Sequence, residues 1–189
     1  MDYPVVINTP RYVFRDFEAA DYAPFRAYHA DSRYRALYGP DESAPDHADR
    51  LLEMFRAWAA ERPRLNYQFA VSSRGEGSGL VGCAGLRQKG HEHGTAELGI
   101  ELAPGYWGRY RTAIEIASGL LEFGFSTLGL AEIVGSTTSA NLRAARLAAW
   151  FGGVLVESAP GAEWMQERGW AETRWRVARE ALQRSAKRP

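Results

Sequence analysis

The stretch of sequence that decides the fold is Ala96-Glu97-Leu98-Gly99-Ile100-Glu101-Leu102-Ala103-Pro104-Gly105-Tyr106-Trp107-Gly108-Arg109-Tyr110-Arg111-Thr112. Its pattern predicts a strand over residues 95–102, a proline–glycine stop, and a helix over residues 109–128 with small and apolar residues every three or four positions. The first amides of a helix have no partner inside the helix, and they lie at its positive end. With Arg109 and Arg111 beside them, these amides are suited to bind a phosphate. On spacing alone, a plain helix start with two solvated arginines remains the alternative.

The chain before this segment predicts a strand over residues 12–17 and a helix that Asp21 caps, with a proline in its first turn. Apolar residues spaced by three and four predict a long helix from Ala44 until a proline stops it at position 63. Strands are expected over residues 66–72 and 79–86. Short polar linkers join them to each other and to the strand over residues 95–102, which predicts an antiparallel meander.

The chain after this segment predicts a strand over residues 133–137, a mostly buried helix over 142–151, a strand from Val154 and a last strand over 173–178. Hairpin-linked strands combined with β-α-β crossovers indicate an α/β (α+β) fold. We therefore expect a mixed, mostly antiparallel sheet with helices on both faces, and not an all-parallel doubly wound fold.

Composition bounds the function. The chain has 189 residues with 23 basic and 23 acidic side chains, a formal net charge of zero that argues against a nucleic-acid or anionic-membrane partner. The length predicts one domain, residues 1–180, followed by a polar tail, residues 181–189. No apolar run is long enough to span a membrane, and no secretory signal is visible, so we expect a cytoplasmic protein.

Metal and thiol chemistry are not expected. Cys83 is the single cysteine, which excludes an internal disulfide and a multi-cysteine metal site, and a small buried thiol is its expected role. His91-Glu92-His93 has no third ligand in view and is interpreted as a polar turn. No metal is therefore predicted.

Several motifs in one order resemble the GNAT superfamily of N-acetyltransferases, and within it the branch that acetylates the amino-terminal alanine of ribosomal proteins. They are Leu98-Gly99-Ile100-Glu101-Leu102-Ala103-Pro104, Tyr106-Trp107-Gly108-Arg109, Phe123-Gly124-Phe125, Leu128-Gly129-Leu130, Thr138-Ser139-Ala140-Asn141 and Arg146-Leu147. The resemblance covers nearly the whole chain. It implies a GNAT fold with acetyl-CoA as acyl donor, in which the strand over residues 95–102 splays from the strand over residues 133–137.

The resemblance also implies which residues bind the donor. The pantetheine arm of acetyl-CoA would lie in the splayed opening, bound by main-chain groups of Ile100 and Leu102, with Asn141 as a further hydrogen-bond partner. Asn141 is equally suited to cap the helix that follows it. The diphosphate would bind the loop Trp107, Gly108, Arg109, Tyr110, Arg111 and Thr112.

This loop departs from the family pattern Gln/Arg-x-x-Gly-x-Gly/Ala, because Tyr110 and Thr112 replace small residues. Glycine is used where a backbone closely approaches a ligand, so Tyr110 is expected to crowd the diphosphate or to shift the helix start. If the backbone at these positions is already helical, a Cβ is tolerated and the amides still point at the phosphate.

Glu97 is the candidate general base, at the position where many family members place a catalytic glutamate, because an attacking ammonium must first lose a proton. An exposed strand glutamate is the alternative interpretation, and Glu101, on the same face by period-two alternation, is the reserve. The two family positions for a proton donor to the leaving sulfur hold Ala144 and Ala148. Solvent, Ser139 or Tyr110 could take that role.

The predicted function is direct transfer of an acetyl group from acetyl-CoA to a primary amine, a small molecule or a protein amino terminus. The acceptor is expected near Tyr34, Tyr38 and the helix that follows them. A non-catalytic module that only binds acyl-CoA is the alternative. Trp164, Trp170 and Trp175 are expected in the core or at an interface, and an interface would leave a homodimer open.

Overall fold

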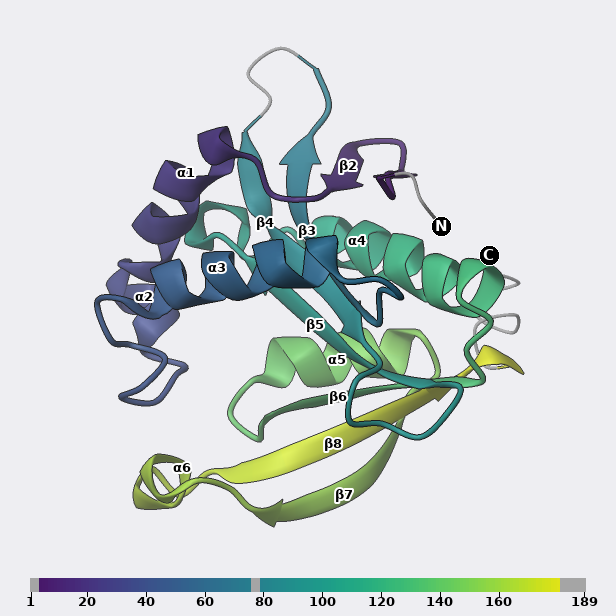
Figure 1. The fold of residues 1–189 in the computed structure, drawn as a ribbon. Coiled ribbons are helices and arrows are strands. Elements are labelled where there is room, and N and C mark those ends of the chain that lie inside the picture. Colours follow the sequence, from purple (N-terminus) through teal and green to yellow (C-terminus); the bar gives the residue numbers. More distant parts are fainter. Residues whose placement is uncertain (1–3, 76–78, 181–189) are drawn as a thin grey trace.

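The computed structural model describes residues 4–75 and 79–180, and these form one mixed sheet with helices on both faces (Figure 1). The eight strands of this part lie in the order β1-β2-β3-β4-β5-β6-β8-β7. Neighbouring strands are antiparallel except β5 and β6, which are parallel. The strands are β1 (Ile7–Asn8), β2 (Tyr12–Arg15), β3 (Asn66–Ser73), β4 (Leu80–Arg87), β5 (Thr95–Leu102), β6 (Glu132–Thr138), β7 (Val154–Pro160) and β8 (Ala171–Ala178).

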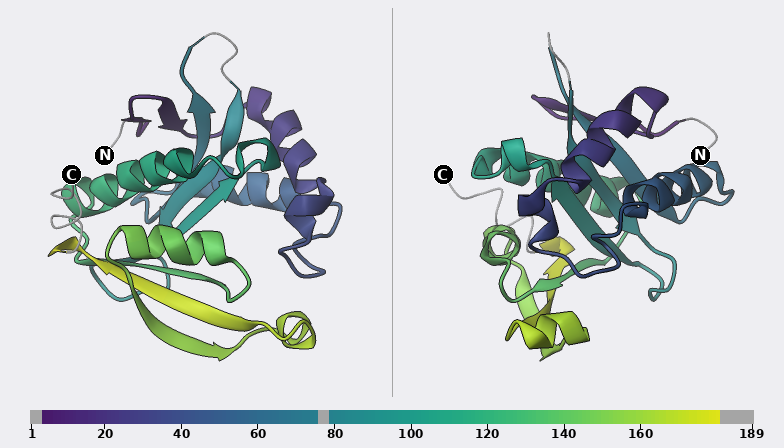
Figure 2. Two further views of the ribbon diagram at one scale, coloured as in Figure 1. Left: turned by 180° about the vertical axis from the view of Figure 1, so that it is seen from behind. Right: turned by 90° about the vertical axis from the view of Figure 1, so that its left-hand side faces the viewer.

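The helices divide between the two faces of the sheet, with α1 and α3 on one face and α4 on the other (Figures 1 and 2). They are α1 (Ala19–His29), α2 (Ser32–Arg35), α3 (His47–Ala60), α4 (Tyr110–Glu122), α5 (Leu142–Trp150) and α6 (Glu163–Glu167). A short 3-10 turn, Pro104–Tyr106, precedes α4, and a π-helical turn, Phe123–Thr127, continues it. No helix in the described part is both long and apolar enough to cross a membrane.

Two apolar cores hold these layers together. The core under α4 includes Phe14, Phe69, Leu86, Ile116, Leu120 and Ile133. The core under α1 and α3 includes Phe25, Tyr28, Tyr34, Leu52, Phe55 and Cys83. Each large apolar side chain buried in this way contributes about 1.5–3 kcal/mol. The sheet is therefore packed on both faces, and this packing fixes the positions of β5 and β6.

The two parallel strands separate soon after they pair. Their register runs from Thr95 opposite Glu132 to Glu97 opposite Val134 and stops there. Beyond this point β6 continues with β8 alone, as far as Thr138 opposite Glu172. Figure 1 shows β5 and β6 diverging from their shared end. This confirms the predicted fold class, including its splayed strand pair.

Element boundaries needed correction where capping decides them. Helix α1 starts at Ala19, two residues before the predicted cap, because Glu18 is the N-cap. Asp21 is the third helical residue, and its Oδ2 accepts the Glu18 N–H at 2.8 Å, so the two form a capping box. Helix α3 starts at His47 rather than Ala44.

The predicted burial of the helix over residues 142–151 is wrong. Helix α5 forms there, but it contains no buried residue, and Leu142 and Trp150 are 61% and 50% exposed. It packs beside β8 and along the opening between β5 and β6, and most of its apolar residues line that opening. Of the predicted range, Leu147 packs against the core under α4, and Phe151, just after α5, is buried in it. Short elements such as β1, α2 and α6 carry too few residues for a periodic signal. The predicted tail, residues 181–189, lies outside the described residues, and the domain boundaries stay a prediction.

Candidate active site

The free edge of β5 faces the opening. The Ala103 N–H donates to the Val81 carbonyl of β4 at 2.9 Å. Since main-chain groups of successive strand residues point to opposite sides, those of Leu98, Ile100 and Leu102 point away from β4 and into the opening. The Trp107 indole N–H donates to the Leu102 carbonyl at 2.7 Å, which occupies that acceptor. Both groups of Ile100 and the N–H of Leu102 remain for a ligand.

The turn at the far end of this edge presents unpaired amides. Gly108 has a φ of +81°, a left-handed conformation that favours glycine, and it redirects the chain into α4. Among the described residues, the amides of Gly108, Tyr110 and Arg111 have no hydrogen-bond acceptor. They lie at the positive end of the α4 dipole, so this turn suits an anion.

Tyr110 and Thr112 leave these amides uncovered. The Tyr110 hydroxyl donates to the Arg146 carbonyl of α5 at 2.9 Å, and its ring lies edge-on to Trp150. Thr112 is buried against the core, where its hydroxyl is hydrogen-bonded to the Tyr12 hydroxyl at 2.8 Å. The Thr112 amide donates to Arg109 in the first helical turn. Both replacement side chains are therefore directed to other elements, and Thr112 faces the core, not the loop surface on which the sequence placed it.

A cleft of about 1260 Å³ joins this turn to the other side of the sheet. Charged side chains of both signs line it. Arg109, Arg143 and Arg146 line it beside α4 and α5, while Glu42 and Glu101 line it beside the aromatic residues of α2 and α3. Glu172 and the paired Arg87 and Glu97 also line it. One arm therefore suits an anion and the other a cation with an apolar body. The second arm contains the predicted acceptor residues Tyr34 and Tyr38.

Glu97 lies at the closed end of the opening, in the last residue pair that β5 makes with β6. Its Oε2 is 3.4 Å from Arg87 Nη2 and 3.9 Å from His91 Nε2. The side chain is about one-third exposed. Glu97 thus reaches the cleft but shares its charge with an arginine.

Glu101 lies four residues further along the same face. Its Oε2 is 3.4 Å from His29 Nε2, accepts the Tyr28 hydroxyl at 3.3 Å and contacts the Cys83 thiol at 3.6 Å. Burial acts to raise the pKa of Glu101, but its neighbours, His29 foremost, together outweigh burial, and the net pKa lies below the usual value. The α1 partners could not be read from the sequence, because they lie more than 70 residues away with no motif.

Asn141 caps α5, since its Oδ1 accepts the Ala144 N–H at 3.2 Å and its amide donates to Thr137 Oγ1. Its side chain also borders the cleft, so the predicted contact with a donor stays open as a second role. Ala144 and Ala148 line the cleft without a proton-donating group. Ser139 accepts the Ala171 N–H at 3.0 Å and is thereby committed to the sheet.

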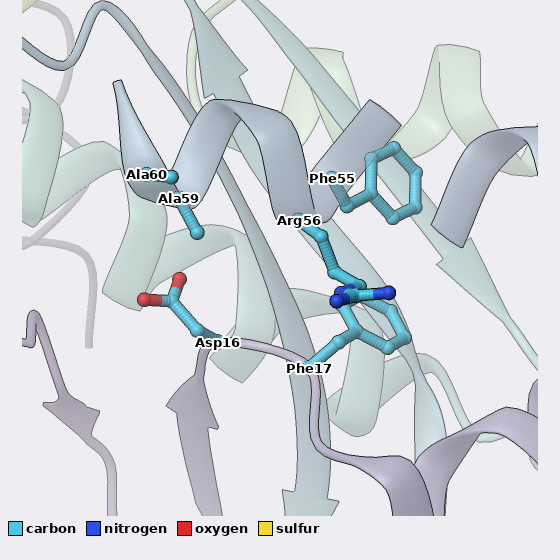
Figure 3. A pocket seen from close by; sticks show the side chains of 6 residues that line it. All are labelled: Asp16, Phe17, Phe55, Arg56, Ala59 and Ala60. Atoms are coloured by element: carbon cyan, nitrogen blue, oxygen red, sulfur yellow. The ribbon is translucent and has the colours of Figure 1, made fainter. Parts of the chain in front are cut away.

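A second, smaller cavity of about 280 Å³ lies between α3 and the segment after β2 (Figure 3). Asp16 and Phe17 border it on one side, and Phe55, Arg56, Ala59 and Ala60 border it on the other. Arg64 forms two hydrogen bonds to the Asp16 carboxylate, at 2.7 and 3.1 Å. The charge of Asp16 is thereby balanced by Arg64, and the side chains that line the cavity offer no unpaired carboxylate for catalysis. In the described part of the chain, no cluster of three or more His, Cys, Asp or Glu residues could hold a metal.

Comparison with known proteins agrees with this geometry. A family model described as an acetyltransferase (GNAT) domain matches residues 11–154. The uncharacterized N-acetyltransferase YoaA of Bacillus subtilis (strain 168) is 27% identical over 129 residues, which are 68% of this chain and 71% of that protein. An acetyltransferase (GNAT family) from Bacillus anthracis superposes with a TM-score of 0.73 at 22% identity, over 93% of this chain and 99% of that one.

A spermidine N-acetyltransferase from Vibrio cholerae, solved in complex with CoA and spermine, superposes with a TM-score of 0.71 at 20% identity, over 93% of this chain and 99% of that one. At such identities these two structures support the fold alone. The family model covers most of the chain from β2 to the start of β7. The protein therefore belongs to the GNAT acetyltransferase family and is a transferase.

Proposed function

We propose that the protein transfers an acetyl group from acetyl-CoA directly to a primary amine while both substrates are bound. The observation that carries this proposal is the free edge of β5, which leads from the closed end of the opening to the unpaired amides of the α4 turn. A thioester on a long amide-bearing arm with a diphosphate at its other end matches that arrangement in order and in chemistry.

The residues of this chain that would hold the donor follow from the free groups. The N–H and C=O of Ile100 and the N–H of Leu102 would bind the amides of the arm. The amides of Gly108, Tyr110 and Arg111, together with Arg109, would bind the diphosphate. Trp107 would contribute indirectly, because its indole N–H occupies the Leu102 carbonyl. The Thr112 side chain, which is hydrogen-bonded to Tyr12 in the core, would not touch the donor.

The reaction needs little chemistry from side chains. The amine nitrogen bonds to the carbonyl carbon, and the carbon–sulfur bond breaks. The nitrogen gives a proton to water, and the sulfur leaves with the electron pair and takes a proton from water. Holding amine and thioester together lowers the barrier by roughly 7–11 kcal/mol. Main-chain N–H groups of β5 would stabilise the charge that develops on the carbonyl oxygen. Glu97, the carboxylate that the resemblance implies, is the first candidate to accept the proton of the amine.

The acceptor would occupy the arm of the cleft beside α2 and α3, where acidic and aromatic residues face each other. We infer a primary amine, either a small molecule or a protein amino terminus. Acetylation of the amino-terminal alanine of ribosomal proteins, a cytoplasmic location and a homodimer remain predictions of the sequence.

The test has two stages on the full chain. Calorimetry with acetyl-CoA should detect binding, and a CoA-release assay should then detect turnover with at least one amine from a panel of alkyl amines, aromatic ethylamines, polyamines and peptide amino termini. Binding without turnover on any amine would favour the non-catalytic module. No binding would refute both.

A further inference from the structure

The Glu101 carboxylate lies beside a column of aromatic rings, next to His29. The rings of Phe25, His29, Tyr34 and Tyr38 follow one another, with centroids 4.3, 4.5 and 4.4 Å apart. Tyr34 and Tyr38 also line the acceptor arm of the cleft. A cation bound in front of Glu101 would therefore be close to aromatic faces, which add attraction to a positive charge.

This column contains buried polar groups that make no well-aligned hydrogen bond within the described part of the chain. His29 and Tyr34 are 5% and 2% exposed, and neither the two ring nitrogens of His29 nor the Tyr34 hydroxyl makes a hydrogen bond there. His29 Nε2 approaches Glu101 at 3.4 Å without the alignment of a hydrogen bond. A buried polar group without a partner costs about 1–3 kcal/mol, so such a cluster indicates a site that is completed by a ligand.

Arg87 decides which carboxylate of β5 is open to a cation. A side chain at Gly99, between Glu97 and Glu101, would meet the Arg87 guanidinium at 2.6 Å, so the arginine lies over that position. Its Nη2 pairs with Glu97 at 3.4 Å. No Lys or Arg of the described residues pairs with Glu101. The charge of Glu97 is thus balanced by an arginine, and an ammonium is attracted more strongly to Glu101.

We propose that Glu101, backed by His29, binds the reacting ammonium of the acceptor and takes its proton, in place of Glu97. This inference rests on the proposed function. The ammonium loses one proton to a Glu101 oxygen, and the freed amine nitrogen attacks the thioester carbonyl. The carbon–sulfur bond then breaks, the nitrogen loses its second proton to water, and the leaving sulfur takes a proton from water. Glu101 releases its own proton to water after the product leaves. His29 is a positioning residue that holds the carboxylate and its charge in place.

The groups that face Glu101 come from every packed element: Tyr28 and His29 of α1, Tyr34 of α2, Tyr38 of the following loop, His47 of α3 and Cys83 of β4. Burial raises the pKa of Tyr28, Tyr34, Tyr38 and Cys83, which are therefore neutral at pH 7, and burial lowers the pKa of His47. Glu101 is thus the carboxylate of this cluster that can accept the proton.

The test compares Glu101→Gln with the matched control Glu97→Gln, using the best amine for the wild-type enzyme. Because loss of a general base costs about 10²–10⁴-fold, we expect Glu101→Gln to lower kcat/KM for the amine about 100-fold or more. Glu97→Gln should lower kcat/KM by a factor about tenfold smaller than Glu101→Gln does, and both variants should keep the acetyl-CoA Kd of the wild type. Glu101→Asp, which keeps the charge on a shorter arm, should retain an intermediate rate if the Gln variant folds poorly.

A loss in Glu97→Gln as large as that in Glu101→Gln overturns the inference and leaves the proposed function intact. Absence of transfer by the wild-type enzyme refutes the proposed function, and this inference with it. His29→Gln supplies a readout that a purely structural role would not move. Since His29 lowers the pKa of Glu101, its removal should shift the acidic limb of the kcat/KM profile to higher pH. An unshifted limb would remove His29 from the positioning role.

Discussion

Replacement of Thr112 by valine tests whether this residue serves the core or the ligand. The Thr112 and Tyr12 hydroxyls are 2.8 Å apart, and the two residues are 2% and 5% exposed. Valine keeps the shape but leaves the Tyr12 hydroxyl buried without a partner, which costs about 1–3 kcal/mol. For a domain of this size, each kcal/mol corresponds to roughly 2–4 °C in Tm. Thr112→Val should therefore lower the free energy of unfolding in urea by about 1–3 kcal/mol.

The double variant Tyr12→Phe/Thr112→Val tests whether the two hydroxyls depend on each other. Tyr12→Phe with Thr112→Val removes both hydroxyls, so the double variant should be more stable than Thr112→Val alone, and the cycle should give a coupling energy of about 0.5–1.5 kcal/mol. The acetyl-CoA Kd from calorimetry should stay unchanged in all three variants, because the Thr112 side chain faces away from the free amides. A weaker Kd with unchanged stability would refute this reasoning and return Thr112 to the loop surface.

Three further predictions concern a titration, a contact and a turn. Burial acts to raise the pKa of Glu115, but hydrogen bonds from its neighbours outweigh burial and hold the pKa below its usual value. The stabilisation from these bonds is therefore present above the usual pKa of a glutamate and is lost as the pH falls through the folded-state pKa. Glu115→Gln should flatten the acid side of the Tm-versus-pH curve, and an unchanged curve would contradict this. A Cβ at Gly39 would clash with the Trp164 indole, so Gly39→Ala should lower Tm and increase the quenching of Trp fluorescence by acrylamide. A wild-type Tm and wild-type quenching would show that α6 can move away from Gly39. The Cβ of Gly108→Ala would contact no neighbouring atom, but an alanine is strained at a φ of +81°. The variant should therefore lose about 1–2 kcal/mol of stability and bind acetyl-CoA more weakly. A wild-type Kd would argue against the amide turn as the diphosphate site.

The sequence predicted most of the fold because its long elements carry a periodic signal. The meander of β3, β4 and β5 and the helix α4 lie within a few residues of their predicted positions. The proline–glycine stop and Gly108 located the turn, since both act through local backbone conformation. Local patterns of this kind are readable in a single sequence.

Side-chain direction and distant partners could not be predicted in this way. Tyr110 and Thr112 begin one helix, yet the first reaches α5 and the second enters the core, and only the packing of other elements decides this. Glu97 and Glu101 share a strand face, and in the sequence only the family resemblance ranked Glu97 first. Arg87 lies beside Glu97 and His29 lies beside Glu101, and the tertiary fold brings both neighbours there.

Strands with unpaired main-chain groups tend to pair, so contacts elsewhere in the fold must hold β5 and β6 apart. The segment around α6 makes such contacts. The Arg168 guanidinium donates to the carbonyls of Ala36 and Tyr38 at 3.1 and 3.4 Å, which ties the β7–β8 hairpin to the loop after α2. Trp164 packs on Gly39 of the same loop and also borders the cleft. The α6 segment thus joins the part of the sheet that follows β5 to the loop after α2, beside Tyr34 and Tyr38 of the cleft. Residues from both sides of the opening therefore line this arm of the cleft, and its shape depends on the contacts of Arg168 and Trp164.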